Sequence, residues 1–137
     1  MIDPKSGITL LELIVVIIII GILAAFAIPN FYKAIETTKV REAISSLKQI
    51  KAGEVIYYNE EYTYWPRGSA ESNVAIINRR LRLFLDTGEL NWDYYVNATA
   101  RTSFTATAKR QSGNYATQTI TINQVGTWGG TWTGPKP

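Results

Sequence analysis

One apolar segment near the N-terminus constrains the fold of this chain more than any other feature of the sequence. Between Ile8 and Ile28, 18 of the 21 residues are apolar, and the exceptions are Thr9, Glu12 and Gly21. As an α-helix the segment would be about 31 Å long, which matches a hydrocarbon core of about 30 Å. Lipid offers no hydrogen-bond partner to the backbone, so a helix is predicted despite four consecutive isoleucines.

The chain as a whole offers few groups for catalysis. It has no Cys and no His in 137 residues, and 14 Lys and Arg stand against 11 Asp and Glu. The missing residue types exclude a Ser-His-Asp triad, a Cys nucleophile, a Cys/His zinc site and a disulfide framework. We interpret the carboxylate pairs Glu60/Glu61 and Asp86/Glu89 as solvated helix ends. We therefore expect no enzyme activity and no cofactor.

Two general interpretations of the apolar segment meet difficulties. A secretory signal peptide would use Ala25-Phe26-Ala27 as its cleavage site, but the region before it holds Asp3, Lys5 and Glu12 rather than a basic n-region. A plain single-pass anchor leaves the carboxylate of Glu12 in lipid, at a cost of about 2.5–3.5 kcal/mol. A carboxylate in such a helix calls for a cationic partner.

A third interpretation comes from the residues that flank the segment. Lys5-Ser6-Gly7 precedes Ile8-Thr9-Leu10-Leu11-Glu12, and Ile28-Pro29-Asn30 follows the apolar run. This pattern resembles the N-terminus of type IV pilins and of the pseudopilins of type II secretion. Two details depart from the commonest form of the motif. Ile8 stands where phenylalanine is usual, and Ser6 separates Lys5 from Gly7.

The resemblance implies a division of the chain into three parts. Residues 1–7 would be a leader that a prepilin peptidase removes after Gly7, and the new N-terminal Ile8 would be N-methylated. Residues 8–29 would form a transmembrane and assembly helix. Residues 30–137 would form a pilin-like globular domain that includes an amphipathic continuation of the helix.

Glu12 is the candidate residue for filament assembly. Cleavage after Gly7 would create a cationic α-amine at Ile8, and Glu12 of one subunit could then meet the Ile8 amine of a neighbour. Such pairing removes most of the burial penalty, and it fixes the axial register because a misplaced subunit would bury both charges unpaired. The alternative is an interfacial residue whose carboxylate reaches the lipid head groups.

Gly21 and Pro29 are the predicted weak points of the helix. Pro29 removes one backbone hydrogen bond and clashes with the carbonyl of Ala25. One possibility is a helix that ends at Ile28 and is followed by a new helix. The other, which the resemblance implies, is one long helix with a soft segment between Gly21 and Pro29 that can unwind during filament packing.

Periodicity predicts two further helical segments. An amphipathic helix is expected from Asn30 to about Glu60, interrupted on its apolar stripe by Lys51 and Glu54 and weakened by Gly53. A second, short helix is expected between a cap at Ser69 and a stop at Gly88. The apolar stripe of the first comprises Val40, Ala43, Ile44, Leu47, Val55 and Tyr58, and that of the second comprises Val74, Ile77, Leu81, Phe84 and Leu85.

After Leu90 the apolar period changes to two, which predicts β-strands. The alternating runs are 92–96, 104–109 and 115–123, and the last two are joined by a turn at Gln111–Asn114. Residues 125–137 are interpreted as a coil tail or a short edge strand. The predicted fold class is α+β, with a long N-terminal helix packed on a small antiparallel sheet of three to four strands.

The charge pattern bears on ligands and on the type of pilin. Residues 94–137 contain no Asp or Glu, which argues against a calcium loop built from carboxylates there and weakens the pseudopilin assignment. The absence of Cys removes the disulfide loop of many type IV pilins. A basic patch for DNA or an anionic surface is considered, but a solvated face with intersubunit ion pairs is favoured over it. The patch would comprise Arg79, Arg80, Arg82, Arg101, Lys109 and Arg110.

The sequence thus predicts a structural subunit of a type IV pilus-like filament, with further copies of itself as its main partner. The alternatives are a pseudopilin of a type II secretion system and a secreted or membrane-anchored binding domain. The resemblance implies a prepilin peptidase, an assembly ATPase and a platform protein as further partners. It also implies an inner-membrane location with the domain in the periplasm before assembly, and then a surface pilus or a periplasmic pseudopilus. Nucleic-acid binding is not expected.

Overall fold

A computed structural model of the chain describes residues 7–88 and 91–136. The chain divides into two compact units, residues 1–36 and residues 37–137, here named the N-terminal unit and the C-terminal unit. The predicted leader, apart from Gly7, therefore lies outside the described residues, and so does Glu89 of the second carboxylate pair.

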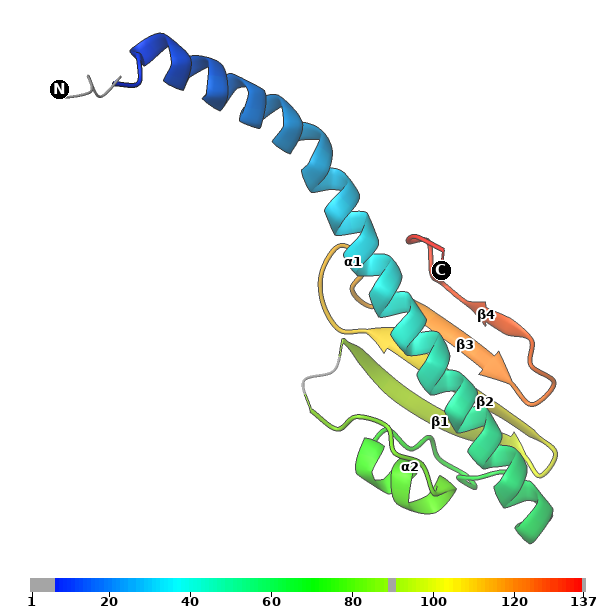
Figure 1. The fold of residues 1–137 in the computed structure, drawn as a ribbon. Helices are drawn as coiled ribbons and strands as arrows, with labels where there is room; N and C mark the ends of the chain where they lie inside the picture. The colour runs from blue at the N-terminus through cyan, green and yellow to red at the C-terminus, as the bar shows by residue number, and fades with distance from the viewer. Residues whose placement is uncertain (1–6, 89–90, 137) are drawn as a thin grey trace, which may run out of the picture. The chain divides into compact units, whose positions relative to one another are not determined.

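A single helix, α1, runs from Leu10 to Glu61, and Pro29 lies inside it (Figure 1). The helix is also continuous through Gly21. Beside the proline, the side-chain amide of Asn30 donates a hydrogen bond to the carbonyl of Phe26 at 3.1 Å. The chain thus forms one long helix, and the alternative with a helix end at Ile28 is wrong. Unwinding of the segment between Gly21 and Pro29 during filament packing stays a prediction.

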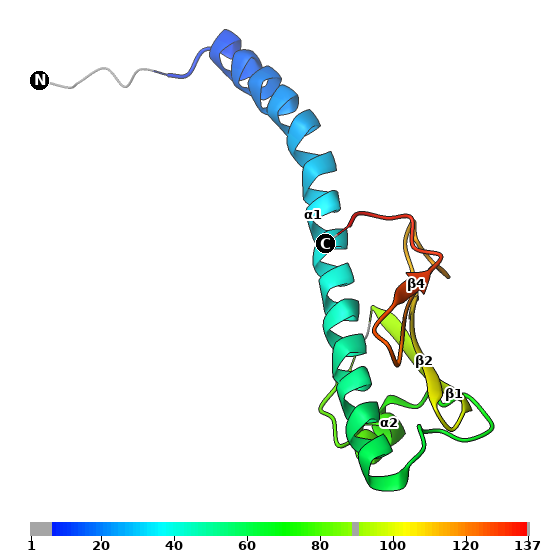
Figure 2. The same cartoon turned by 90° about the vertical axis from the view of Figure 1, so that its right-hand side faces the viewer.

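In the C-terminal unit, α1 lies against one face of a four-stranded antiparallel sheet with the order β1-β2-β3-β4 (Figure 2). Burial alternates along each of the three longer strands, as expected for a sheet with one face on the core. The predicted α+β fold is thereby confirmed. The strands are β1 (Trp92–Ala100), β2 (Ser103–Arg110), β3 (Thr119–Asn123) and β4 (Trp128–Gly130).

The core alternates large and small residues across the sheet. Tyr94 of β1, Ala108 of β2 and Ile120 of β3 form one cross-strand row. The next row has the same large-small-large order and consists of Val96, Ala106 and Ile122. Alanines on the middle strand leave room for the helix, and the buried α1 residues of this core are Val40, Ala43, Leu47 and Ile50.

The apolar stripe of α1 departs from its predicted course near the end of the helix. Val55 is 40% exposed, so its predicted place in the core is wrong, whereas Glu54 is buried. The C-terminal end of α1 contacts α2, and a Cβ on Gly53 would lie 2.8 Å from the Cβ of Leu81. Gly53, interpreted from sequence as a weakness, therefore permits close approach of α2 to α1.

Helix α2 is shorter than expected and runs from Val74 to Leu81. Asn73 caps it by accepting hydrogen bonds from the backbone N–H groups of Ala75 at 3.0 Å and Ile76 at 3.3 Å. At the other end, Arg82 adopts the left-handed conformation with a φ of 55°. The predicted cap at Ser69 and stop at Gly88 are therefore wrong.

The segment after α2 is ordered by a side chain rather than by helix. The carboxamide of Asn78 accepts from the N–H of Leu85 at 2.9 Å and donates to its carbonyl at 2.8 Å. Leu85 is thereby held in the core, while Phe84 is 96% exposed. Phe84 was predicted on the apolar face of a helix, but the chain has left the helix before it, so that prediction is wrong.

Two strand boundaries also differ from the sequence prediction. β1 continues beyond Asn97, with a register irregularity between Asn97 and Ala100. β3 begins at Thr119 rather than at Tyr115, because residues 114–117 form turns and Thr117 has a φ of 69°. The tail contributes the short strand β4, where Gly130 is required because a Cβ would collide with the carbonyl of Thr119.

Candidate assembly site

The N-terminus of α1 is closed by a reciprocal pair of hydrogen bonds between Thr9 and Glu12. The backbone N–H of Thr9 donates to Oε2 of Glu12 at 3.1 Å, and the N–H of Glu12 donates to Oγ1 of Thr9 at 3.2 Å. The Thr9 hydroxyl also lies 3.1 Å from the same Oε2 and donates to it. This is a capping box, which satisfies two donors that would otherwise lack a partner at a helix start.

Both bonds from Thr9 reach the same carboxylate oxygen. Oε1 of Glu12 accepts no hydrogen bond from any residue that the structure describes. The capping box thus fixes the direction of the carboxylate and leaves one oxygen for a donor outside the chain. The threonine-x-x-glutamate spacing before an apolar run is the sequence signature of this motif, and it could have been recognised without the structure.

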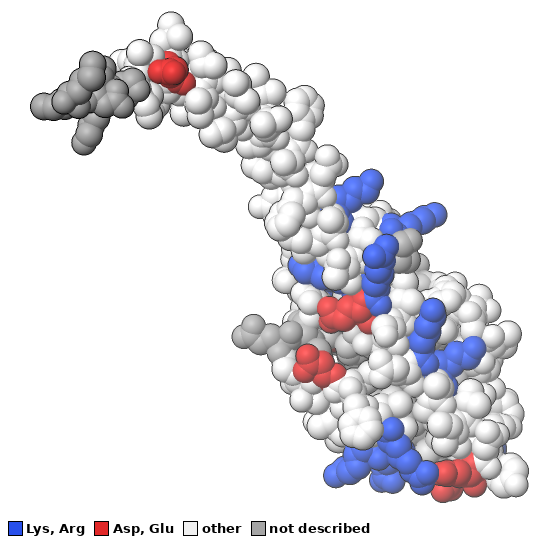
Figure 3. Space-filling view, viewed as in Figure 1, with Lys and Arg blue, Asp and Glu red and all other residues white. Residues whose placement is uncertain are grey.

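The helix around this carboxylate presents an apolar surface to its surroundings. Between residues 7 and 34 every described side chain is exposed except that of Ala24, which is half-buried. Glu12 is the one charged residue from position 7 to position 32, and Figure 3 shows a single acidic side chain on the otherwise uncharged described start of α1. Among the described residues, α1 is the one helix that is long and apolar enough to cross a membrane.

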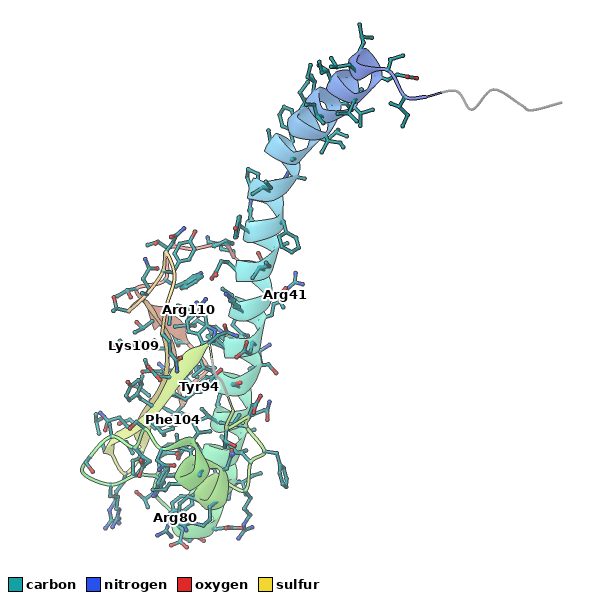
Figure 4. The ribbon with its side chains drawn as sticks, turned by 90° about the vertical axis from the view of Figure 1, so that its left-hand side faces the viewer. Arg41, Arg80, Tyr94, Phe104, Lys109 and Arg110 are labelled. Carbon is teal, nitrogen blue, oxygen red and sulfur yellow. The ribbon has the colours of Figure 1, made fainter. Side chains whose placement is uncertain are left out.

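The six basic residues considered as a patch do not gather on one surface. Arg110 is only 2% exposed, donates to the carbonyl of Asn91 at 2.7 Å and lies over the ring of Trp92. Lys109 is paired in register with Asp93, on the opposite face of the sheet from Arg110. Figure 4 shows Arg80 at the far end of the C-terminal unit from both. The prediction that Arg110 belongs to a surface patch is therefore wrong. Arg101 lies exposed in the turn between β1 and β2.

The three remaining arginines share their surroundings with acids. Arg79, Arg80 and Arg82 line an open hollow of about 450 Å³ together with Tyr57, Glu60 and Glu61. Arg82 makes an ion pair with Glu60, with 2.8 Å between Nη1 and Oε1. Because two carboxylates offset most of the local positive charge, this hollow has little of the field that attracts a polyanion.

The described residues provide no obvious place for a metal ion. Within residues 7–88 and 91–136, no three acidic side chains lie close enough together to hold one. The candidate site itself consists of a helix start, a carboxylate with one open oxygen and an uncovered apolar surface.

One sequence motif and several known proteins match part of this chain. Residues 3–28 match the prokaryotic N-terminal methylation motif. A type IV major pilin, PilA of Myxococcus xanthus, is 45% identical over 63 residues, which cover 45% of this chain and 29% of that pilin. A fimbrial protein, EcpC of Eikenella corrodens, is 37% identical over 71 residues, covering 52% of this chain and 46% of EcpC.

A third similar protein is also a type IV pilin. The type IV major pilin PilE of Neisseria gonorrhoeae is 37% identical over 71 residues, which cover 52% of this chain and 42% of PilE. The chain thus spans less than half the length of these curated relatives. No solved structure matches it.

The fold and the site define a class of protein in which an apolar N-terminal helix continues into a small α+β domain. The methylation motif covers the start of that helix, and the chain is similar over about half of its length to type IV pilins.

Proposed function

We propose that the chain is a structural subunit of a type IV pilus-like filament, assembled through its N-terminal helix. The observation that carries the proposal is the single carboxylate of Glu12 on an otherwise apolar and uncovered surface. A charge in such surroundings is costly unless it meets a cation. Relatives named as type IV major pilins support the same role.

In the proposed assembly, the two oxygens of Glu12 have different partners. Oε2 stays in the capping box with Thr9, while Oε1 accepts from the α-amine of Ile8 in a neighbouring subunit. That amine exists only after hydrolysis of the Gly7–Ile8 peptide bond, so assembly depends on processing. The capping box pre-orients the carboxylate, which lowers the entropy lost when the intersubunit pair forms.

The same surface explains how the subunit is kept before assembly. The apolar helix suggests membrane anchoring, and the pilin relatives point to a filament at the cell surface. The finer steps belong to the proposal: insertion in the inner membrane, cleavage after Gly7 by a prepilin peptidase and N-methylation of Ile8. In the proposed pathway, an assembly ATPase and a platform protein supply the energy for assembly and the extrusion of the filament.

Substitution of Glu12 tests this proposal. Glu12→Gln keeps the side-chain length and an acceptor oxygen for Thr9 but removes the charge. We expect the variant to reach the membrane in normal amount and to be strongly depleted from sheared filaments, by at least tenfold relative to the wild type, or about 1.4 kcal/mol. Immunoblots of the membrane and filament fractions measure both quantities.

A matched pair at Thr9 separates the cap from the charge. Thr9→Ser keeps the hydroxyl and should assemble nearly normally, whereas Thr9→Val removes it and should reduce assembly less than Glu12→Gln does. Normal incorporation of Glu12→Gln would refute the proposed role of the carboxylate. Imaging of a strain with and without the gene then distinguishes a surface pilus from a short periplasmic pseudopilus.

A further inference from the structure

A second carboxyl group lies buried in the C-terminal unit, far along α1 from Glu12. The side chain of Glu54 has 0% exposure. Its Oε2 accepts a hydrogen bond from the backbone N–H of Trp65 at 2.9 Å, while its Oε1 is buried without a partner among the described residues. A buried carboxyl with one unsatisfied oxygen is costly when neutral and far more costly when ionised.

The N–H that Glu54 holds belongs to the segment that follows α1. Residues 62–67, here named the latch segment, begin at Tyr62, whose φ of 56° ends the helix. Within this segment, the ring of Tyr64 stacks on Tyr58 of α1 with 4.6 Å between centroids and lies 4.8 Å from that of Phe104. The backbone N–H of Tyr64 also donates to the carbonyl of Arg101 at 3.1 Å.

These contacts make Glu54 the link between α1 and the latch segment. The carboxyl group holds the middle of the segment through its hydrogen bond with the backbone N–H of Trp65. Because Glu54 is fully buried, water can reach it only if part of its surroundings moves. We propose that Glu54 is a pH-sensitive latch, which keeps residues 62–67 on the domain while it is neutral and releases them locally when it ionises, with the sheet still folded.

The physical cause of the switch is desolvation. Burial raises the pKa of Glu54 from 4.5 to about 7, and the hydrogen bond from Trp65 lowers it by a smaller amount. In the released state the carboxyl meets water and regains an ordinary pKa. The ionised form therefore favours release, and the balance between docked and released segments changes across the neutral range.

Among the described residues, no cation contributes to the raised pKa of Glu54, which results from burial opposed by the hydrogen bond from Trp65. On α1, Tyr58 lies one helical turn from Glu54, and on the latch segment Tyr64 has a pKa that is raised by burial, by Tyr58 and by Glu54. Arg67, at the end of the segment, points its Nε toward the hydroxyl of Thr63 at 3.4 Å. The sheet contributes the ring of Phe104, and α2 contributes Leu81 at the adjacent Gly53.

Amide hydrogen exchange of Trp65 tests the latch directly, because its N–H is the donor to Glu54. The full chain in detergent micelles is compared at about pH 5.5 and about pH 8.5, with each rate divided by the intrinsic rate at that pH. We expect the protection factor of Trp65 to fall by on the order of tenfold or more as the pH rises. Amides of the central strand β2 should keep their protection.

Two variants give the control. Glu54→Gln cannot ionise, so the protection of Trp65 should no longer depend on pH, whereas Glu61→Gln, at the exposed end of the same helix, should keep the wild-type dependence. A protection factor that stays constant or rises with pH in the wild type would overturn the proposal. So would an equal loss of protection in β2, since that result means global unfolding.

If Glu54→Gln fails to fold, a titration of the wild-type protein tests the latch. The carboxyl carbon of Glu54, observed by NMR in the same micelles, should titrate near neutral pH and in step with the exchange of Trp65. Titration at the ordinary value of a glutamate would overturn the latch. Neither experiment involves filament assembly, so the outcome is independent of the role proposed for Glu12.

Discussion

The two portions of α1 have the same secondary structure and opposite surroundings. In the N-terminal unit, residues 10–34 are exposed almost without exception, although most are apolar. In the C-terminal unit, the same helix buries Val40, Ala43, Leu47 and Ile50 against a sheet. The first portion is apolar on all sides, while the second is apolar on one side only.

The difference shows which partner each portion requires. A helix with an apolar stripe buries that stripe on its own domain, and the remaining faces stay in water. A helix that is apolar all round has no such solution within one chain, so lipid or further copies must cover it. The C-terminal portion of α1 stabilises the C-terminal unit, whereas the N-terminal portion requires lipid or a further copy of the chain to cover it.

The largest expected effect is on the free energy of unfolding, when the same leucine-to-alanine substitution is made in each portion of α1. Leu47→Ala leaves a cavity in the core and should lower the free energy of unfolding by about 2–5 kcal/mol. Leu23→Ala, on the exposed portion, should change it by less than about 0.5 kcal/mol. Urea unfolding of each variant in micelles, followed by tryptophan fluorescence, measures both. Equal losses would contradict the division into two units.

A smaller effect concerns the pH dependence of stability in the C-terminal unit. Because the folded pKa of Glu54 is raised from 4.5 to about 7, its contribution is fully present below pH 4.5 and is lost as the pH rises through about 7. We expect the free energy of unfolding to fall by about 1–3 kcal/mol over that range, limited by release of residues 62–67. Glu54→Gln should flatten the profile, and a profile that rises with pH would be inconsistent with this account.

A third effect tests the contact between α1 and α2. Gly53→Ala gains about 1 kcal/mol of helix propensity but places a methyl group against Leu81, so the net result should be a loss of about 1–2 kcal/mol. Ala52→Gly, one residue earlier on the exposed face, isolates the propensity effect and should cost about 1 kcal/mol. Stabilisation by Gly53→Ala would show that α2 does not approach as closely as the structure indicates.

The smallest effect concerns the cap of α2. Asn73→Ala removes the acceptor for two backbone N–H groups and should cost about 1 kcal/mol, while Asn73→Ser should retain most of the stability. Ser69→Ala, at the position predicted from sequence, should change nothing measurable. Thermal unfolding of the three variants provides the comparison.

The long-range features of the fold could be predicted because their signals are repeated along the sequence. The apolar run and its amphipathic continuation extend over many turns, and α1 ends at Glu61, one residue from the predicted end. Alternation of apolar and polar residues likewise identified the strands of the sheet. Such patterns reflect burial on one face, which does not depend on a single contact.

Boundaries depended on single contacts and were predicted less well. Ser69 and Asn73 are both good caps, and only the folded chain shows that Asn73 meets the N–H groups of α2. Phe84 and Leu85 continue a helical spacing, but Asn78 clamps Leu85 in an extended segment instead. These side chains form hydrogen bonds with backbone groups several residues away. The periodicity of apolar residues does not reveal such bonds.

The candidate site was predicted in part. Glu12 stands out in the sequence as the one charge in an apolar run, and its role in assembly stays a prediction. Its hydrogen bonds with Thr9 could have been predicted from the spacing of the two residues. Glu54 was interpreted as an interruption of the apolar stripe of α1, because charged residues are mostly exposed in folded proteins. Its burial could not be predicted without the contacts of the folded chain.

The central claim is that the Ile8 amine and Glu12 connect processed subunits into a filament, and the N-terminus of the filament subunit tests it most directly. Sheared surface filaments are digested, and the N-terminal peptide is identified by mass spectrometry. The account predicts a peptide that begins at Ile8 and carries one methyl group on its α-amine. A peptide that begins at Ile28, as cleavage after Ala27 would produce, would contradict it, because neither the amine nor the carboxylate would then be present to assemble the filament.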